Sequence, residues 1–159
     1  MEYYMKWDTY TICVTVLVLV LIATSSFMLV KVQPKSSWWI LCFIYLALLA
    51  VFLYMPYKVG YNDKAIYVQR IKGRVEIPFD SILSVEQIGS GELLNSVRIF
   101  GSGGFLGNIG YFKNEKFGTY IMYTTSSENL VRIKTETKMY VINFPDTLLA
   151  DIKDKLNGF

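Results

Sequence analysis

The chain divides into a strongly apolar N-terminal part and a C-terminal part in which apolar and polar residues alternate. Residues 10–30 and 38–57 form two runs without a charged residue. A helix over the first run would be about 31 Å long, close to the roughly 30 Å hydrocarbon thickness of a bilayer. The pattern therefore predicts two transmembrane helices, joined by the short polar connector KVQPKSS at 31–37.

Aromatic residues mark the ends of the second run. Trp38 and Trp39 open it, and Tyr54 and Tyr57 close it. Trp and Tyr concentrate at the two interfaces between membrane and water, so their placement favours a span over 38–57.

A cleaved signal peptide is the alternative for the first run, since residues 23–25 (Ala-Thr-Ser) resemble a cleavage site. The residues ahead of the run, however, contain Glu2 and Asp8 against Lys6, so they lack the basic character of a signal peptide. The apolar run also continues to Val30, which favours a retained helix.

The basic residues predict the orientation of the hairpin. Those near the membrane on the side of the two termini are Lys6, Lys58, Lys64, Arg70, Lys72 and Arg74. The connector carries Lys31 and Lys35. Because cytoplasmic segments carry the excess of Lys and Arg, we expect both termini in the cytoplasm.

From residue 58 onward, short runs rich in Val, Ile, Tyr and Phe alternate with Gly, Asn, Asp and Ser, which is typical of strands and turns. Lys72-Gly73 and residues 135–137 are predicted turns. The predicted strands lie near 65–70, 74–78, 83–88, 96–100, 108–112, 120–124, 130–135 and 138–144.

A C-terminal helix is predicted to begin at Pro145, because Pro suits the first helical position. Leu148, Leu149, Ile152 and Leu156 fall at helical spacing on one face. The expected fold is thus a two-helix transmembrane hairpin, followed by a mainly-β domain. We expect a small antiparallel barrel or sandwich of about seven strands capped by this helix.

Composition excludes several function classes. The chain is 53% hydrophobic, has a net charge of +3 and contains no histidine. It has two cysteines, both in apolar runs, and no paired-carboxylate, metal-binding or nucleophile motif. We therefore expect no catalytic residue, no metal, no cofactor and no nucleic-acid partner.

Three stretches together resemble a bacterial pleckstrin-homology-like (PH-like) domain protein with two N-terminal transmembrane helices. They are VEIPFDSILSV at 75–85, the glycine-rich RIFGSGGFLGNIGYF at 98–112 and MYVINFPD at 139–146. The resemblance implies a hairpin over 1–57, a cytoplasmic PH-like domain over 58–159 and a place in the bacterial cell membrane. It implies little chemistry.

The first candidate site is basic. Lys64, Arg70, Lys72 and Arg74 loosely match the pattern by which some PH domains hold lipid headgroups, and alternation predicts that Arg70, Lys72 and Arg74 project to one face. Basic residues beside a bilayer attract anionic headgroups by about 1 kcal/mol each. The alternative is a solvated hairpin whose charges only satisfy the positive-inside bias.

The second candidate is the glycine-rich stretch 101–112, GSGGFLGNIGYF. It lacks the Lys-Ser/Thr of a phosphate-binding loop. Two interpretations stay open. The stretch is either a hairpin in which the glycines allow the backbone conformations of turns and bulges, or an apolar loop that presents Phe105, Leu106 and Ile109 to the bilayer or to a protein.

We therefore predict a non-catalytic, membrane-anchored scaffold or interaction module that acts on a protein partner or on a second copy of itself. Two alternatives stay open. One is recognition of anionic membrane lipids by the basic hairpin and the glycine-rich loop, and the other is an accessory subunit of a larger membrane complex.

Overall fold

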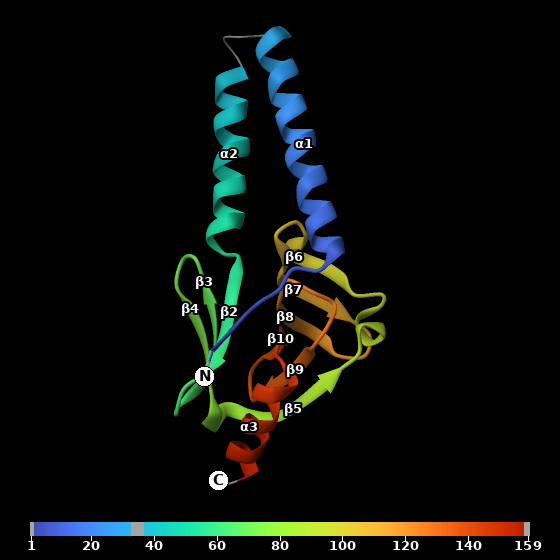
Figure 1. Ribbon diagram of the computed structural model, residues 1–159. Helices are drawn as coiled ribbons and strands as arrows, with labels where there is room; N and C mark the ends of the chain where they lie inside the picture. Colours follow the sequence, from blue (N-terminus) through green and yellow to red (C-terminus); the bar gives the residue numbers. More distant parts are fainter. Residues whose placement is uncertain (1, 33–36, 158–159) are drawn as a thin grey trace.

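The computed structural model describes residues 2–32 and 37–157, and Lys35 and the side chain of Leu156 lie outside its described part. Two helices, α1 (Thr9–Val32) and α2 (Ser37–Leu53), stand side by side and antiparallel above a β-rich domain (Figure 1). The hydroxyl of Tyr45 in α2 donates to Ser26 Oγ in α1 over 3.5 Å. Both termini lie at the domain end of the helices (Figure 1).

Helix α1 is long and apolar enough to cross a membrane. It has 24 residues, and its most apolar stretch has a mean hydropathy of 2.6 with 6% of its residues buried. Helix α2 has 17 residues, about 26 Å. Within the described residues, α1 alone meets the length criterion for a span. One transmembrane candidate is therefore supported, rather than the predicted pair.

The second apolar run does not form one helix over 38–57. Helix α2 ends at Leu53, and strand β2 begins at Pro56. Proline has no N–H to donate and disfavours helical backbone at the residue before it, so the helix ends and the chain enters the sheet.

The first sheet has four antiparallel strands in the order β1-β2-β3-β4. Their bounds are β1 Glu2–Tyr4, β2 Pro56–Tyr61, β3 Ala65–Arg70 and β4 Arg74–Pro78. Strands β3 and β4 confirm the sequence prediction, whereas β1 and β2 were not predicted. The residues ahead of α1 thus join the sheet of the domain.

The second sheet has six strands in the order β5-β9-β10-β8-β7-β6. Short 3₁₀ turns, η1 Phe79–Ser81 and η2 Ser90–Leu93, flank β5. The strand bounds are β5 Ile82–Ile88, β6 Val97–Gly104, β7 Gly107–Asn114, β8 Gly118–Thr124, β9 Leu130–Thr135 and β10 Met139–Asn143.

One pairing departs from the expected antiparallel arrangement. Strand β10 lies between β8 and β9, pairing antiparallel with β9 and parallel with β8. The chain leaves β8, forms β9 two places along the sheet and returns between them as β10, so β8 and β10 run in the same direction.

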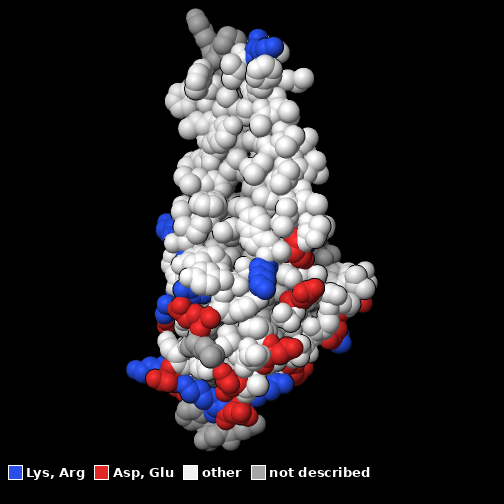
Figure 2. All heavy atoms as spheres, viewed as in Figure 1, with Lys and Arg blue, Asp and Glu red and all other residues white. Residues whose placement is uncertain are grey.

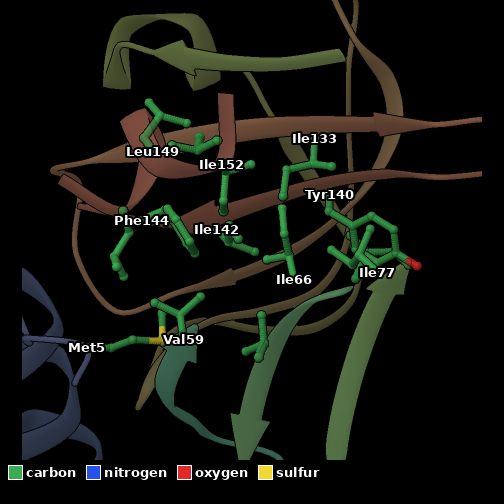
Figure 3. Close-up of a cluster of buried hydrophobic side chains, with 14 of the residues drawn as sticks. Met5, Val59, Ile66, Ile77, Ile133, Tyr140, Ile142, Phe144, Leu149 and Ile152 are labelled. Carbon is green, nitrogen blue, oxygen red and sulfur yellow. The ribbon is translucent and has the colours of Figure 1, made fainter. Parts of the chain in front are cut away.

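The two sheets share one core with helix α3 (Asp146–Asn157), so the domain is a sandwich of two sheets and not one closed barrel. Figure 3 shows side chains from both sheets and from α3 converging on this core. Leu148, Leu149 and Ile152 of α3 are buried in it, which confirms the predicted apolar face. A second cluster, around Tyr120 and Val141, lies on the other face of the six-stranded sheet, since its residues alternate along β8 and β10 with those of the first.

The segment before α1 fixes that helix to the domain. Met5 is buried in the main core, and its N–H donates to the Tyr57 carbonyl over 2.9 Å. Asp8 caps α1 by accepting from the Thr11 N–H at 2.8 Å, and it also accepts from the Ser127 N–H at 2.9 Å. The helix therefore begins from a held position on the domain.

Charged side chains are distributed unevenly. Figure 2 shows that acidic and basic side chains gather over the domain, while the helical pair is uncharged except at its far end. Lys31 lies in the last turn of α1 at that end. A long uncharged surface bounded by charge at both ends is typical of a membrane-spanning segment.

Candidate functional site

A pocket of about 570 Å³ lies where α2 meets the domain. This volume falls within the roughly 300–1,000 Å³ of small-molecule sites. The pocket is formed by the end of α2, strand β3, the β6–β7 hairpin and strand β8. Its lining residues are Ala50, Val51, Tyr54, Arg70, Phe100, Gly101, Ser102, Ile109, Gly110, Tyr111 and Tyr123.

Arg70 is the charged residue of this lining. It ends β3 on the strand face that also carries Ile66 and Val68, so its side chain points toward the inner side of the sheet. Its guanidinium carbon lies 5.2 Å from the ring centre of Tyr54 and 6.0 Å from that of Tyr123. Aromatic faces attract a cation at these distances, which holds the guanidinium in the pocket wall.

The hydrogen-bonding capacity of Arg70 is not used up. Its Nε is buried and, within the described residues, has no hydrogen-bond partner. None of the ion pairs found among residues 2–32 and 37–157 involves Arg70. The guanidinium thus carries its positive charge without an ion-pair partner among the described residues, so an anion in the pocket would be stabilising.

Tyr123 faces the same space. Burial raises the pKa of its phenol above the ordinary value, and the positive charge of Arg70 opposes that shift. The phenol therefore stays neutral and keeps its O–H as a donor at physiological pH. A cation and a neutral hydroxyl together favour binding of an oxyanion.

The β3–β4 turn positions the site relative to the helices. The N–H of Lys72 donates to the carbonyl of Leu53 over 2.7 Å, and that of Ile71 to the carbonyl of Met55 over 3.4 Å. The final carbonyls of a helix have no partner within it, so the turn satisfies the end of α2. The pocket therefore sits directly at the domain end of α2.

The glycine-rich stretch forms the β6–β7 hairpin. Gly101 and Gly110 face each other across the two strands, at φ of 117° and 126°. A β-carbon on Gly101 would lie 2.0 Å from the Ile109 carbonyl oxygen, and one on Gly110 would lie 2.2 Å from that of Phe100. The glycines are thus required by the close approach of the two backbones.

The tip of this hairpin packs on α1. Leu106 and Ile109 are buried, and Phe105 is half-buried. The N–H of Leu106 donates to Thr15 Oγ1 of α1 over 3.0 Å. The structure therefore supports the interpretation of residues 101–112 as a hairpin. Leu106 and Ile109 do not form an exposed apolar tip.

Comparison with protein families decides the identity of the domain. The family model described as "Bacterial PH domain" matches residues 57–155, more than half of the chain. The chain belongs to this family. The comparisons with curated proteins and with solved structures give no significant match.

In this bacterial PH domain, the four predicted basic residues do not form one cluster. Arg74 pairs with Gln69 and lies 4.1 Å over the Tyr67 ring, on the sheet face opposite to Arg70. The expectation that Arg70 and Arg74 share a face is wrong. Arg74 lies opposite Gln69 across the hairpin, and the side chains of Gln69 and Arg70, neighbours on β3, point to opposite faces of the sheet.

Lys72 and Lys64 are separated as well. Lys72 is exposed in the β3–β4 turn, beside the end of α2. Lys64 precedes β3 at its other end, close to Phe79, whose N–H donates to the Lys64 carbonyl over 3.0 Å. Six residues of extended strand, roughly 20 Å, separate Lys64 from the pocket.

The aromatic walls of the pocket were missed at the sequence level. Phe100, Tyr111 and Tyr123 come from three strands, and Tyr54 from the turn after α2. Tyr54 carried one signal, as an interfacial aromatic at the end of an apolar run. The other three lie in ordinary strand patterns, so no local signal separates them from core residues.

Proposed function

We propose that this bacterial PH domain is a non-catalytic interaction module that α1 and α2 hold at the cytoplasmic face of a bacterial membrane. The surface of α1 carries the proposal. Large apolar side chains such as Leu17, Leu21 and Phe27 are exposed along it, whereas Thr11 and Thr15 near its start are buried against the domain. Apolar surface of this extent favours lipid over water.

The attachment supports a fixed orientation of the domain. The start of α1 is bonded to the β6–β7 hairpin through Thr15 and to the loop after β8 through Asp8. Because α1 continues directly from these contacts, the same face of the domain would always be turned toward the membrane. Confinement to a surface raises its local concentration, so that weak contacts become effective.

Helix α2 is proposed as the returning pass. Its about 26 Å is slightly less than the hydrocarbon thickness, a mismatch that membranes accommodate by local thinning or by snorkelling of flanking residues. Trp38 and Trp39 at one end are strongly exposed, and Tyr54 just beyond the other is 45% exposed, as interfacial residues would be. If α1 and α2 each cross the membrane, strand β1 before α1 and strand β2 after α2 lie on the same side of it, as their pairing requires.

The outer edge of β6 is the surface that we assign to a protein partner. Strand β6 is at the end of the six-stranded sheet, so one side of its backbone has no neighbouring strand among residues 2–32 and 37–157. Val97, Ile99 and Phe100 are exposed along it, with Phe100 at 75%. An apolar edge strand offers both backbone hydrogen bonds and side-chain contact to an added strand.

Site-specific photo-crosslinking in bacterial membranes tests this function. A benzophenone amino acid replaces Phe100 in the full chain, and Lys134, exposed on β9, a strand with a neighbour on each side, serves as the matched control position. We expect a discrete protein adduct at 100, absent at 134 and lost when Ile99→Lys places a charge on the edge.

The mass of the adduct separates a second copy of the chain from a different protein. Equal adducts at both positions, or an adduct that persists in Ile99→Lys, would contradict docking at the edge. Recovery of the chain in the soluble fraction after gentle lysis would contradict the anchored module as a whole.

A further inference from the structure

The pocket at the end of α2 joins two surfaces of opposite character. One wall is apolar and comes from Ala50 and Val51 of α2 and from Phe100 and Ile109 of the β6–β7 hairpin. The other carries the Arg70 guanidinium with the phenols of Tyr54 and Tyr123 around it. A ligand that fills this space needs an anionic group and an apolar part.

We propose that this pocket binds one anionic phospholipid, with the lipid phosphate at Arg70 and an acyl chain along the apolar wall. The inference rests on the proposed placement of α1 and α2 in a membrane. It differs from recognition by the basic hairpin, because Lys64 and Arg74 take no part in it.

Charge is the first argument. Arg70 is the charged group among the residues lining the pocket, and its buried Nε has no acceptor within the described residues. A guanidinium presents several donors in one plane, which matches two oxygens of a phosphate. Binding of an anion would therefore neutralise a partly buried cation that has no ion-pair partner among the described residues.

Position is the second argument. Ala50 and Val51 belong to the last turn of α2, and Tyr54 follows directly. In the proposed placement, this level is the boundary between acyl chains and headgroups, where lipid phosphates lie. Ala50 and Val51 line the apolar wall at this level, where an acyl chain of the adjacent leaflet would reach it.

Size and polarity favour a lipid over a small soluble anion. Inorganic phosphate would occupy only a small part of about 570 Å³ and would leave the apolar wall in contact with water. Tyr54 and Tyr123 lie close to Arg70, while Ala50, Val51 and Ile109 give the pocket an apolar part that suits hydrocarbon. A phospholipid supplies both parts in one molecule, and it is already concentrated beside the pocket.

Native mass spectrometry of the full chain in detergent micelles tests the proposal. Phosphatidylglycerol and phosphatidylcholine are titrated separately onto the wild type, Arg70→Gln, Ala50→Phe and Arg74→Gln. Arg70→Gln removes the charge, and Ala50→Phe fills the apolar wall while leaving Arg70 in place. Arg74→Gln is the matched control, since it removes the same charge from the opposite face of the same hairpin.

We expect one phosphatidylglycerol to be retained by the wild type in preference to phosphatidylcholine. Affinity should fall about tenfold or more in Arg70→Gln, which corresponds to about 1.4 kcal/mol or more. It should also fall in Ala50→Phe and stay within about twofold in Arg74→Gln. Inorganic phosphate in large excess should not displace the lipid.

Three results would overturn the proposal. They are unchanged binding in Arg70→Gln or Ala50→Phe, an equal loss in Arg74→Gln, and displacement by inorganic phosphate at concentrations similar to the lipid. The last would identify a site for a free anion. Thermal unfolding of each variant separates loss of the site from loss of the fold. Extraction of the same variants from membranes separates failure of this site from failure of the proposed anchoring.

Discussion

Replacing Gly101 by alanine tests how closely the backbones of β6 and β7 approach each other. The new β-carbon would lie 2.0 Å from the Ile109 carbonyl oxygen, a distance that real β-carbons essentially never show. The obstacle is backbone, so the two strands would have to separate by more than 1 Å. Alanine would also be forced toward the φ of 117° that Gly101 adopts.

The cost can be estimated from these two effects. A non-glycine residue in such a sparsely populated region costs about 1–3 kcal/mol. Separating the strands would lose at least one backbone hydrogen bond, about 0.5–1.5 kcal/mol net, and would loosen the contact of the hairpin with α1. We expect a total of about 3 kcal/mol, or a Tm lower by about 6–12 °C for a chain of this size.

Gly103→Ala is the matched control on the same strand. Its β-carbon would lie 3.3 Å from a guanidinium nitrogen of Arg98, an exposed and flexible side chain, and its φ is outside the left-handed region. This change should lower the stability by no more than about 1 kcal/mol. Thermal unfolding of the full chain in detergent, followed by near-ultraviolet circular dichroism, measures both. Equal Tm values for the two variants would refute the reasoning.

Three further predictions concern the junction of α1 with the domain. Thr15→Val, which keeps the shape but removes the acceptor for the buried Leu106 N–H, should cost about 1–3 kcal/mol and speed hydrogen exchange at that amide. Protection equal to the wild type would contradict it. Asp8→Ala should cost about 1–2 kcal/mol through loss of the helix cap, while Asp8→Asn should retain part of that stability, as their Tm values would show. Burial would raise the pKa of Asp8, but hydrogen bonds from Thr11 and Ser127 outweigh it and lower the pKa. The stabilisation is therefore present above the ordinary carboxyl pKa of about 3.9 and lost as the pH falls further. The Tm difference between the wild type and Asp8→Asn should shrink below about pH 4, and a constant difference would contradict this assignment.

Most elements of the domain were predictable because their signals are local. The eight expected strands all occur, and those at 65–70, 74–78 and 130–135 have the predicted bounds. Here apolar and polar residues alternate between turn residues, and that alternation reports which face of a strand is buried. The apolar face of α3 followed from the same logic at helical spacing.

Strands β1 and β2 escaped prediction for physical reasons. Strand β1 has three residues, too few to display a period, and it pairs with a strand that follows more than 50 positions later. Strand β2 begins at Pro56 inside an uninterrupted apolar run. Hydrophobicity alone does not show where such a run changes from helix to strand.

The candidate site was only partly visible in the sequence. Arg70 was singled out for its charge, but the neighbours that give it a pocket come from α2, β6, β7 and β8. Leu106 and Ile109 were singled out as apolar, but their burial depends on the hairpin packing against α1 and the domain. Contacts between distant segments of this kind leave no local pattern.

Cysteine accessibility in bacterial membranes tests the central claim, that the helical pair lies in the membrane with the domain in the cytoplasm. The native thiols are removed by Cys13→Ser and Cys42→Ser, and single thiols are introduced by Leu21→Cys, Leu46→Cys or Glu128→Cys. All three replaced side chains are exposed in the structure. The account predicts that a membrane-impermeant maleimide labels the thiol at 128 only in opened cells. It also predicts that the thiols at 21 and 46 stay unlabelled until the membrane is dissolved and the protein denatured. Labelling at 21 in opened cells as fast as at 128 would contradict the account.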